Sequence, residues 1–386
     1  MSNIKFTTTF AITVLVVWIV FLKAEGRQNI FSFSENKFNT EKRKDYDTSK
    51  QGSDGPIIVY ENGDIKSYSI VAFDTAFKIS KRVITKADSL FCYVDETGQK
   101  FGFQLKDTIK CEIDTFALPD KMLIISDIHG NFKGLQMILT GAGVLNNNLN
   151  WFFGKGHLVI EGDFFDRGIN VTECLWLIYK LEKEAEKCGG KVHLILGNHE
   201  IMNMKGSYRD VRYKYFINSI ILDLNYKNWY SSDSELGRWL RSKNSIEKIG
   251  NFLFLHGGIS KDFPKGILSI TEINDSIRAG IDKNFSKGEL SKNIFLGNSG
   301  PLWYRGLVKE TENLEEIEQT LKSLNAVKMI LGHTIVDKIK YLYKEYIIAV
   351  NVDHQINTDK GLMLALWFEN NTFSIIDAEG NKTDLK

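Results

Sequence analysis

The feature that most constrains the fold is a pattern that recurs after residue 120: a short apolar run that ends in a side chain able to bind a metal ion. Five such runs lie between residues 121 and 333, and helical spacing alternates with them. The side chains that follow the runs belong to Asp127, His129, Asp163, Asn198, His199, His256 and His333. Alternating β and α patterns predict an α/β fold, in which sites gather at the carboxyl ends of strands. We therefore expect these side chains to form one site.

Each of these histidines, taken alone, is more typical of a hydrogen-bonded histidine in a core or on a surface. Their number changes that interpretation, because four of the seven histidines in the chain stand at the ends of these runs. One coincidence of a strand end with a ligand is common, but five in one chain favour a functional site.

The side-chain chemistry fits two metal ions. Aspartate and histidine are donors that suit Mn, Fe or Zn, and a site for two such ions needs a carboxylate that bridges them. Asp163 comes from the middle run, and we predict that it is the bridge. Asp127 and His129 would complete one ion. The ligands of the other ion would be Asn198, His256 and His333. A neutral asparagine ligand leaves positive charge that helps to hold an anionic substrate.

Five blocks of sequence resemble the signature of the calcineurin-like metallophosphoesterases. They are SDIHGN, GDFFDRG, GNHE, LHGG and LGHT, and the resemblance covers residues 121 to about 355. The DRG and GNHE endings are similar to the phosphoprotein phosphatase branch of that superfamily. GNHEIMNM, GRWLRSKNSIEKIGNFLFLHGGIS and GPLWYRG resemble the Shewanella-like protein phosphatases. Ser126, where many relatives have glycine, and Ile169–Asn170 after DRG depart from the pattern outside the predicted ligands.

This resemblance implies a mechanism in which a hydroxide bound to the two ions attacks phosphorus in line, without a covalent phosphoenzyme. It implies that Asp166 orients the imidazole of His199, which protonates the leaving oxygen. Arg167 and Arg305 match two phosphate-binding arginines, and Asn198 and His199 complete the residues expected to contact the phosphate. Arginine suits that role because its planar fork matches two phosphate oxygens.

The resemblance also implies the fold, a four-layer α/β/β/α sandwich. The candidate helices are residues 132–142, 170–188, 208–224 and 310–324. The runs assigned to the second sheet are residues 338–343, 346–352, 361–368 and 373–376.

The segment before the catalytic region is expected to have three parts, and it lies outside the resemblance. Residues 1–26 contain a short uncharged apolar run, which predicts a single-pass membrane anchor, or a signal peptide and export if it is cleaved; a buried core helix is the alternative. Residues 27–55 are polar and predict a flexible linker. Residues 56–118 predict a small accessory β unit with a hairpin at DETGQ. Residues 119–386 would form the catalytic domain.

Charge and cysteine content exclude some classes of protein. The chain has 49 basic and 48 acidic residues, so its composition does not indicate binding to nucleic acid. The four cysteines lack the spacing of a zinc site. Cys174 lies in an apolar helical pattern and is expected to be an inert buried thiol. Cys92 and Cys111 could pair in an oxidising compartment, although we expect them to be unpaired.

The function expected from these observations is that of a metal-dependent phosphomonoesterase, in particular a protein phosphatase. Its cofactor would be two divalent metal ions, with Mn as the first choice and Fe or Zn as alternatives. A symmetrical dinucleoside-polyphosphate hydrolase is the main alternative, because its family shares DRG and GNHE. A small-molecule phosphatase and a membrane-tethered binding protein that retains the fold are further alternatives. The substrate would be a phosphoprotein or a phosphorylated small molecule.

Overall fold

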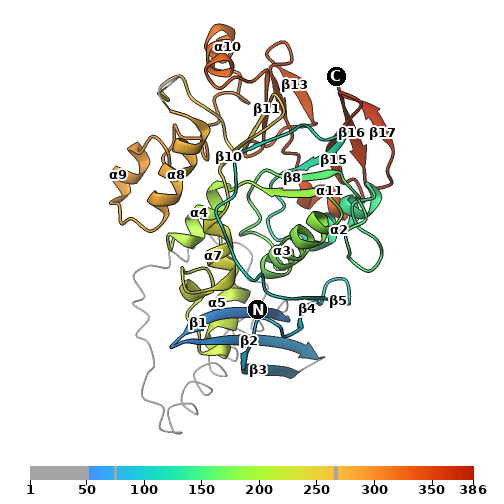
Figure 1. Ribbon diagram of the computed structural model, residues 1–386, viewed down its shortest axis with the longest axis vertical. Helices are drawn as coiled ribbons and strands as arrows, with labels where there is room; N and C mark the ends of the chain where they lie inside the picture. The colour runs from blue at the N-terminus through green and yellow to red at the C-terminus, as the bar shows by residue number, and fades with distance from the viewer. Residues whose placement is uncertain (1–51, 74–75, 265–267) are drawn as a thin grey trace, which may run out of the picture. The chain divides into compact units, whose positions relative to one another are not determined.

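The computed structural model describes residues 52–73, 76–264 and 268–386 (Figure 1). The predicted anchor at residues 1–26 and residues 27–51 of the predicted linker lie outside this part of the chain. Among the described residues, no helix combines the length and the apolar character needed to cross a membrane.

The catalytic region is built on two six-stranded sheets. Sheet 1 has the order β17-β16-β15-β7-β8-β9, with the bounds Lys382–Asp384, Thr372–Asp377, Leu364–Glu369, Lys121–Ile125, His157–Ile160 and Lys191–Leu194. Sheet 2 has the order β13-β14-β12-β11-β10-β6, with the bounds Lys340–Leu342, Ile347–Ala349, Lys328–Leu331, Phe252–Leu255, Ile246–Ile249 and Thr115–Phe116. The ring of Phe252 in sheet 2 contacts the rings of Phe368 and Phe373 in sheet 1, so the two sheets share one core.

Helices flank both sheets, which gives the layered α/β architecture that the sequence predicts (Figure 1). Among them, α3 packs on β9 of sheet 1 and α8 packs on β10 of sheet 2. The bounds of the described helices are α2 Phe132–Gly141, α3 Val171–Lys187, α4 Asn198–Met204, α5 Tyr213–Leu222, α6 Tyr226–Trp229, α7 Glu235–Arg241, α8 Ile270–Ile281, α9 Lys287–Lys292, α10 Leu314–Ser323 and α11 His354–Asp359.

The parallel strands end in register, and this register positions the site. In sheet 1, Ile125 of β7 pairs with Ile160 of β8, which pairs with Leu194 of β9. In sheet 2, Leu255 of β11 pairs with Leu331 of β12. The five predicted strands are confirmed as β7, β8, β9, β11 and β12. The metal-competent side chains follow the carboxyl ends of these strands, where the loops leave the two sheets.

The prediction that the carboxyl-terminal strands form one sheet is wrong, because they are divided between the two sheets. β13 and β14 belong to sheet 2, whereas β15 and β16 belong to sheet 1. β15 lies antiparallel to β7, and β14 lies parallel to β12. An alternating apolar pattern predicts a strand, but the neighbour of that strand is set by long-range packing.

The predicted helix at 208–224 also begins later than expected. Arg212 has extended backbone dihedrals, with φ of −70° and ψ of 148°, and α5 starts at Tyr213. The preceding loop is held because the backbone N–H of Arg167 donates to the carbonyl oxygen of Asp210 at 3.2 Å. The other three predicted helices occur within a few residues of their expected bounds, as α2, α3 and α10.

The accessory β unit consists of a three-stranded sheet and a hairpin. The sheet contains β1 Asp54–Glu61, β2 Asp64–Phe73 and β3 Ala76–Ile84, and the hairpin contains β4 Leu90–Val94 and β5 Gln99–Phe103. The hairpin at DETGQ is confirmed. The predicted end of the linker at residue 55 is too late in the sequence, because Ser53 and Asp54 are buried and β1 starts at Asp54.

The end of the accessory unit differs from the prediction as well. The run TIKCEI, residues 108–113 within the predicted β unit, forms no strand, and β6, which follows it, pairs with β10 and so extends sheet 2. Cys111 in that run is exposed, whereas Cys92 is buried in β4, and both are free cysteines. Cys174 is buried, as predicted.

A buried ionic network joins the segment that follows β5 to the catalytic region. The Nζ of Lys243 contacts carboxylate oxygens of Glu182, at 2.5 Å, and of Glu112. Glu182 also accepts from Lys106 Nζ and, at 2.8 Å, from Trp239 Nε1. Burial by itself would raise the pKa of Glu112, but the charges of Lys243 and Lys191 outweigh it and lower the pKa to about 2.

We expect Lys243→Met to destabilise the fold by about 3–5 kcal/mol, because removal of one partner leaves buried carboxylates short of positive charge. Chemical denaturation at neutral pH measures this loss, and Lys187→Met, at an exposed position, is the matched control. Glu112 has a pKa below its ordinary value of 4.5, so its contribution is present above that pH and fades as the pH falls towards 2. The difference between wild type and Lys243→Met should therefore shrink in acid. A difference that stays constant from pH 7 to pH 3 would show that the ion pairs do not stabilise the fold.

Candidate metal centre and active site

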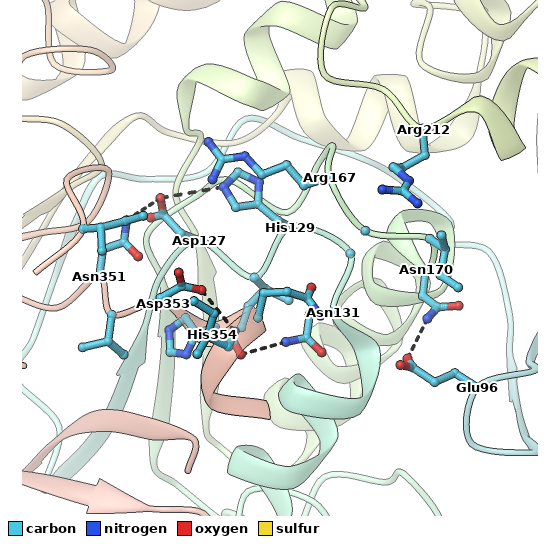
Figure 2. A pocket seen from close by; sticks show the side chains of 18 residues that line it. Glu96, Asp127, His129, Asn131, Arg167, Asn170, Arg212, Asn351, Asp353 and His354 are labelled. Carbon is cyan, nitrogen blue, oxygen red and sulfur yellow. Dashed lines mark hydrogen bonds and ion pairs between the residues drawn. The ribbon is translucent and has the colours of Figure 1, made fainter. Parts of the chain in front are cut away.

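A pocket of about 440 Å³ opens beside the ends of β7 and β8 (Figure 2). Its floor includes the predicted ligands Asp127 and His129, and Arg167 also lines it. The rest of the wall comes from the loops before α2 and α3, the turn of the β4–β5 hairpin, the segment that leads into α11, and the side chains of Arg212 and Ile335.

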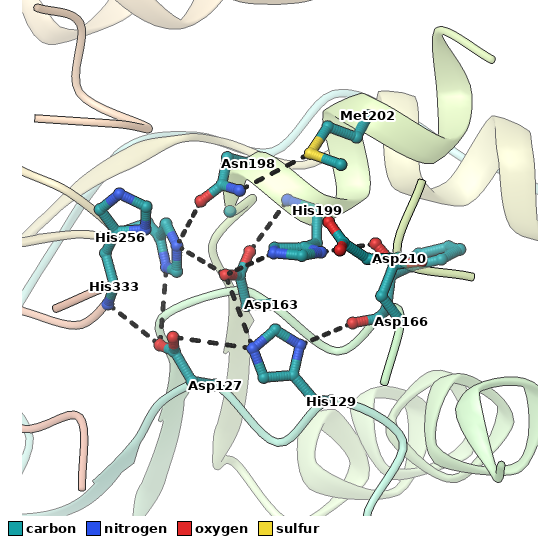
Figure 3. A network of polar contacts seen from close by, with 12 residues as sticks. Asp127, His129, Asp163, Asp166, Asn198, His199, Met202, Asp210, His256 and His333 are labelled. Atoms are coloured by element: carbon teal, nitrogen blue, oxygen red, sulfur yellow. Dashed lines mark hydrogen bonds and ion pairs between the residues drawn. The ribbon is translucent and has the colours of Figure 1, made fainter. Parts of the chain in front are cut away.

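Asp163 lies at the centre of the predicted ligands (Figure 3). Its Oδ2 is 3.0 Å from His256 Nε2, 3.9 Å from His199 Nε2 and 4.0 Å from His129 Nε2. It therefore belongs to two groups that could each hold a metal ion, one with His129 and His199 and one with His256 and His333. Within the described residues, this shared position is the geometry required of a bridging carboxylate.

Asp127 and Asn198 complete the cluster. Asp127 Oδ2 lies 4.0 Å from His129 Nε2, and Asp127 Oδ1 lies 3.9 Å from His256 Nδ1. Asn198 Oδ1 lies 3.1 Å from His256 Nε2. Distances of 3.9–4.0 Å are too long for hydrogen bonds, so these side chains are close neighbours that do not bond to one another directly.

The hydrogen bonds of the histidine rings are consistent with metal binding. The Nδ1–H of His129 donates to the carbonyl oxygen of Phe165 at 2.7 Å, which directs Nε2 into the cluster. That Nε2 is buried and has no hydrogen-bond partner among the described residues. His256 is oriented in the same way, because its Nδ1–H donates to the carbonyl oxygen of Glu161. The donor set therefore fits a divalent cation.

His333 is the member of the predicted ligand set that fits least well. Its Nε2 lies 3.0 Å from the carbonyl oxygen of Trp303, and its Nδ1 lies 3.4 Å from Nη2 of Arg305. Both ring nitrogens thus face protein groups, although the ring is near that of His256. One ring nitrogen of His333 nevertheless lies within 4.8 Å of the ligand atoms of Asp163 and His256, and its role as a ligand stays a prediction.

The buried carboxylates create a demand for positive charge. Burial by itself would lower the pKa of His256, but Asp163 and Asp127 outweigh it and raise the pKa to about 10. Burial dominates at His129 and lowers its pKa to about 4, so its imidazole is neutral at pH 7 and its Nε2 lone pair is available. A cation bound between the carboxylates would take over the role of the proton on His256, so metal binding should release protons.

Several site residues have backbone conformations that non-glycine residues seldom adopt. The residues with φ between +48° and +70° include Asp127, His129, Asp163, Asp166, Arg167 and His333. Each such residue costs about 1–3 kcal/mol and persists only where its surroundings enforce it. Glycine is required where the loops approach most closely: a Cβ on Gly197 would lie 2.3 Å from Asp163 Oδ1, and one on Gly332 would lie 2.0 Å from Ser126 Oγ.

Two buried residues that the sequence analysis did not assign hold the ligand loops in place. Glu200 Oε2 accepts from the N–H groups of Asp163 at 2.9 Å and Gly197 at 2.7 Å, and its Oε1 accepts from Phe164 N. Asn351 Nδ2 donates to Asp127 Oδ2 at 2.7 Å. Glu200 could have been found as the last residue of the GNHE block, whereas no sequence signal marks Asn351.

The predicted general acid lies at the end of a hydrogen-bonded chain. The Nδ1–H of His199 donates to Asp166 Oδ2 at 2.5 Å. Asn203 Nδ2 donates to Asp166 Oδ1 at 3.0 Å, and the hydroxyl of Tyr226 donates to Asn203 Oδ1 at 3.0 Å. Asn203 and Tyr226 are further residues that the sequence analysis missed. This chain sets the orientation of the His199 imidazole and leaves Nε2 facing Asp163.

The two predicted phosphate-binding arginines differ in their surroundings. The guanidinium of Arg167 is exposed to the pocket and forms no hydrogen bond or ion pair within the part of the chain that the structure describes. Arg305 is half-buried, and its Nη1 donates to the carbonyl oxygen of His333 at 2.8 Å. Arg167 is thus available to an anion in the pocket, whereas Arg305 is held against the loop of His333.

The family of the chain follows from a comparison with family models. The calcineurin-like phosphoesterase model matches residues 121–337, which is more than half of the chain. The protein belongs to the calcineurin-like phosphoesterase family. Membership implies a dinuclear divalent metal centre, in agreement with the two ligand groups that share Asp163.

Within this family, the chain is similar to several proteins that are named as protein phosphatases. The chain is 33% identical over 223 residues to Shewanella-like protein phosphatase 1 of Plasmodium berghei. The matched segment covers 55% of this chain and 61% of that protein. It is 25% identical over 272 residues to Shewanella-like protein phosphatase 2 of Arabidopsis thaliana, over 58% of this chain and 68% of that protein. The structure of the cold-active protein-tyrosine phosphatase of a psychrophilic Shewanella species matches with a TM-score of 0.77 and 32% identity.

That structural match extends beyond the catalytic region. It covers 86% of this chain and 99% of the Shewanella chain, which is more than residues 119–386 alone account for. The prediction that the accessory β unit lies outside the resemblance is therefore wrong for at least part of that unit. Sequence blocks around a metal site reveal such a shared unit poorly, because its residues carry packing rather than chemistry.

We expect Asp163→Asn to lower the bound metal from about two ions per chain to less than one, because one carboxylate is shared by both ligand groups. Elemental analysis of the purified protein measures the content, and circular dichroism checks the fold. Asp210→Asn is the control: Asp210 forms a third possible group with Asp166 and His199, but it is exposed. If Asp163→Asn still binds two ions, Asp163 is not the bridging ligand. If Asp210→Asn loses its ions instead, the third group is the metal site.

Proposed function

We propose that this protein is a metal-dependent phosphomonoesterase that acts on phosphoproteins. The observation that carries the proposal is the position of Asp163, shared by two groups of metal-competent side chains beside the unpaired guanidinium of Arg167. With two cations bound, such a site would offer positive charge from the ions and from an arginine to one tetrahedral anion. The names of the similar proteins, among them protein phosphatases, support phosphoproteins as the substrate class.

The metal ligands that we propose are Asp127, His129, Asp163, Asn198, His256 and His333. Manganese is our first choice for the ions, and iron and zinc are alternatives, because the donors are carboxylate, amide and imidazole. Two divalent ions at this site would make water a stronger nucleophile at neutral pH and neutralise charge on the phosphoryl oxygens. Glu200 and Asn351 would keep the two aspartates in position through the hydrogen bonds described above.

His199 is the proposed general acid. Burial by itself would lower its pKa, but the carboxylates of Asp163 and Asp166 outweigh that effect and raise the pKa above its ordinary value. The protonated form that a general acid requires therefore persists to higher pH. Because Asp166 accepts from Nδ1–H, the proton that His199 would give to the leaving oxygen is the one on Nε2.

Arg167 and Arg305 are proposed to bind the phosphoryl oxygens, together with Asn198 and His199. The free guanidinium of Arg167 supports its role, because a charged group without a partner gains most from an anionic ligand. Arg305 would act from the loop of His333, where its Nη1 is already engaged by a carbonyl group.

We predict that His199→Ala slows hydrolysis of alkyl phosphates by about 10²–10⁴-fold and that of p-nitrophenyl phosphate much less, because a good leaving group departs without a proton. Steady-state kinetics on both substrates measures the difference. His157→Ala, which replaces a histidine at the start of β8 away from the site, should leave the ratio of the two activities unchanged. Equal losses on both substrates would instead assign His199 to positioning of the metal ions.

The substrate class is tested by parallel assays of the full chain with manganese. We expect at least one of three peptides, which carry phosphoserine, phosphothreonine or phosphotyrosine, to be hydrolysed with a higher kcat/KM than a diadenosine polyphosphate. The reverse order would identify a symmetrical dinucleoside-polyphosphate hydrolase. Fast hydrolysis of small phosphate esters alone would point to a small-molecule phosphatase.

We also propose that residues 1–26 place the protein at a membrane, or direct its export if the segment is cleaved. The support is the apolar run in the sequence alone. Fractionation of cells that express the full chain or a chain without residues 1–26 tests this, and equal amounts of both in the soluble fraction would contradict it.

A further inference from the structure

The catalytic pocket extends well beyond the residues proposed to bind the scissile phosphate. From Asp127 and His129 it runs past Arg167 to Arg212, and Glu96 of the β4–β5 hairpin forms its far wall (Figure 2). Of the residues proposed to hold the metal ions and the phosphate, Asp127, His129 and Arg167 line this pocket. The remaining space is available to the part of the substrate that carries the phosphate.

The acidic side chains in this outer part of the pocket already have partners. Glu96 Oε2 accepts from Asn170 Nδ2 at 2.7 Å and lies 3.4 Å from the N–H of Lys133. Asp353 Oδ1 accepts from the N–H of Ile356 at 3.1 Å, in the first turn of α11. Neutral donors thus orient both carboxylates.

Arg212 is in the opposite situation. Its side chain is half-buried at the start of α5, where an arginine cannot cap the helix, and it forms no hydrogen bond or ion pair among the described residues. A partly desolvated guanidinium without a partner favours an anion, and its planar fork suits a carboxylate or a phosphate.

The position of Arg212 relative to the active site is held from both sides. Two residues before it, the carbonyl oxygen of Asp210 accepts from the N–H of Arg167 at 3.2 Å. Two residues after it, Nζ of Lys214 donates to the carbonyl oxygen of Ile169 at 2.7 Å, and Lys214 is buried. Both contacts reach the same loop, which carries Arg167, so they fix the backbone at Arg212 beside that loop.

We propose that Arg212 determines substrate specificity by binding a second anionic group, close in the substrate to the phosphate that is removed. The inference rests on the proposed function. It names the substrate class as phosphopeptides with an acidic side chain or a second phosphate beside the phosphorylated residue. Apolar side chains that line the same pocket, Ile169, Ile335, Val352 and Ile356, would contact the uncharged part of the peptide.

The test compares matched phosphopeptides on the full chain. Each peptide carries one substituted position, and together the peptides of a set cover every position within three residues of the phosphorylated residue. The substituted residue is glutamate in the first set, glutamine in the second set and phosphoserine in the third set. We expect wild type to prefer the charged peptide at one or more of these positions. Arg212→Ala should lower kcat/KM for that peptide by about tenfold, a loss typical of one charge-assisted contact. The glutamine peptide should change less than twofold, and Arg212→Lys should retain part of the preference.

Arg82→Ala, which removes an exposed arginine of β3 that does not line the pocket, is the matched control and should leave all three sets unchanged. A preference for glutamate over phosphoserine, or the reverse, identifies which anion Arg212 binds. Equal losses on charged and uncharged peptides, or no preference in wild type, would overturn the role of Arg212 while the phosphatase function stands. If no phosphopeptide is hydrolysed while a diadenosine polyphosphate is, the proposed function itself fails.

Discussion

The burial of two carboxylates, Asp127 and Asp163, around the same histidines is the interaction on which the rest of the site depends. A buried negative charge is costly unless a positive charge compensates it. The pKa of His256, raised to about 10, shows how strongly the two groups attract positive charge. Two divalent cations would satisfy the same demand and supply the chemistry of the family. The fold can thus be understood as a scaffold that keeps these charges together and out of water.

That scaffold maintains its geometry through register, strained turns and hydrogen bonds. Parallel strands that end level bring loops from both sheets to one place. The ligand loops then turn through left-handed conformations, which carry a cost that only well-packed surroundings sustain. Glu200 and Asn351 hold the aspartates, and the chain from Tyr226 to Asp166 holds His199. The accessory unit contributes Glu96 to the same pocket, so it takes part in the site as well as in the fold.

Much of the centre could be predicted from the sequence, because strand ends and metal-competent side chains are local signals. Asp163 and His129 were identified in this way, and the structure brings them together. The partners of β13 to β16 could not be predicted, since strand pairing depends on packing between residues far apart in the chain. Asn351 and Arg212 carry no motif, and their importance comes from where the fold places them. The burial of Asp54 was hidden by the polar residues that precede it.

Whether two cations share one carboxylate at this site can be measured by titration of the metal-free protein with Mn²⁺. Electron paramagnetic resonance distinguishes isolated ions from a coupled pair, because a carboxylate bridge places two ions about 3.5–4 Å apart. If Asp163 forms this bridge, binding of a second equivalent per chain replaces the spectrum of isolated Mn²⁺ with that of an exchange-coupled pair. Saturation at one equivalent, or two equivalents that both give the spectrum of isolated ions, would contradict it.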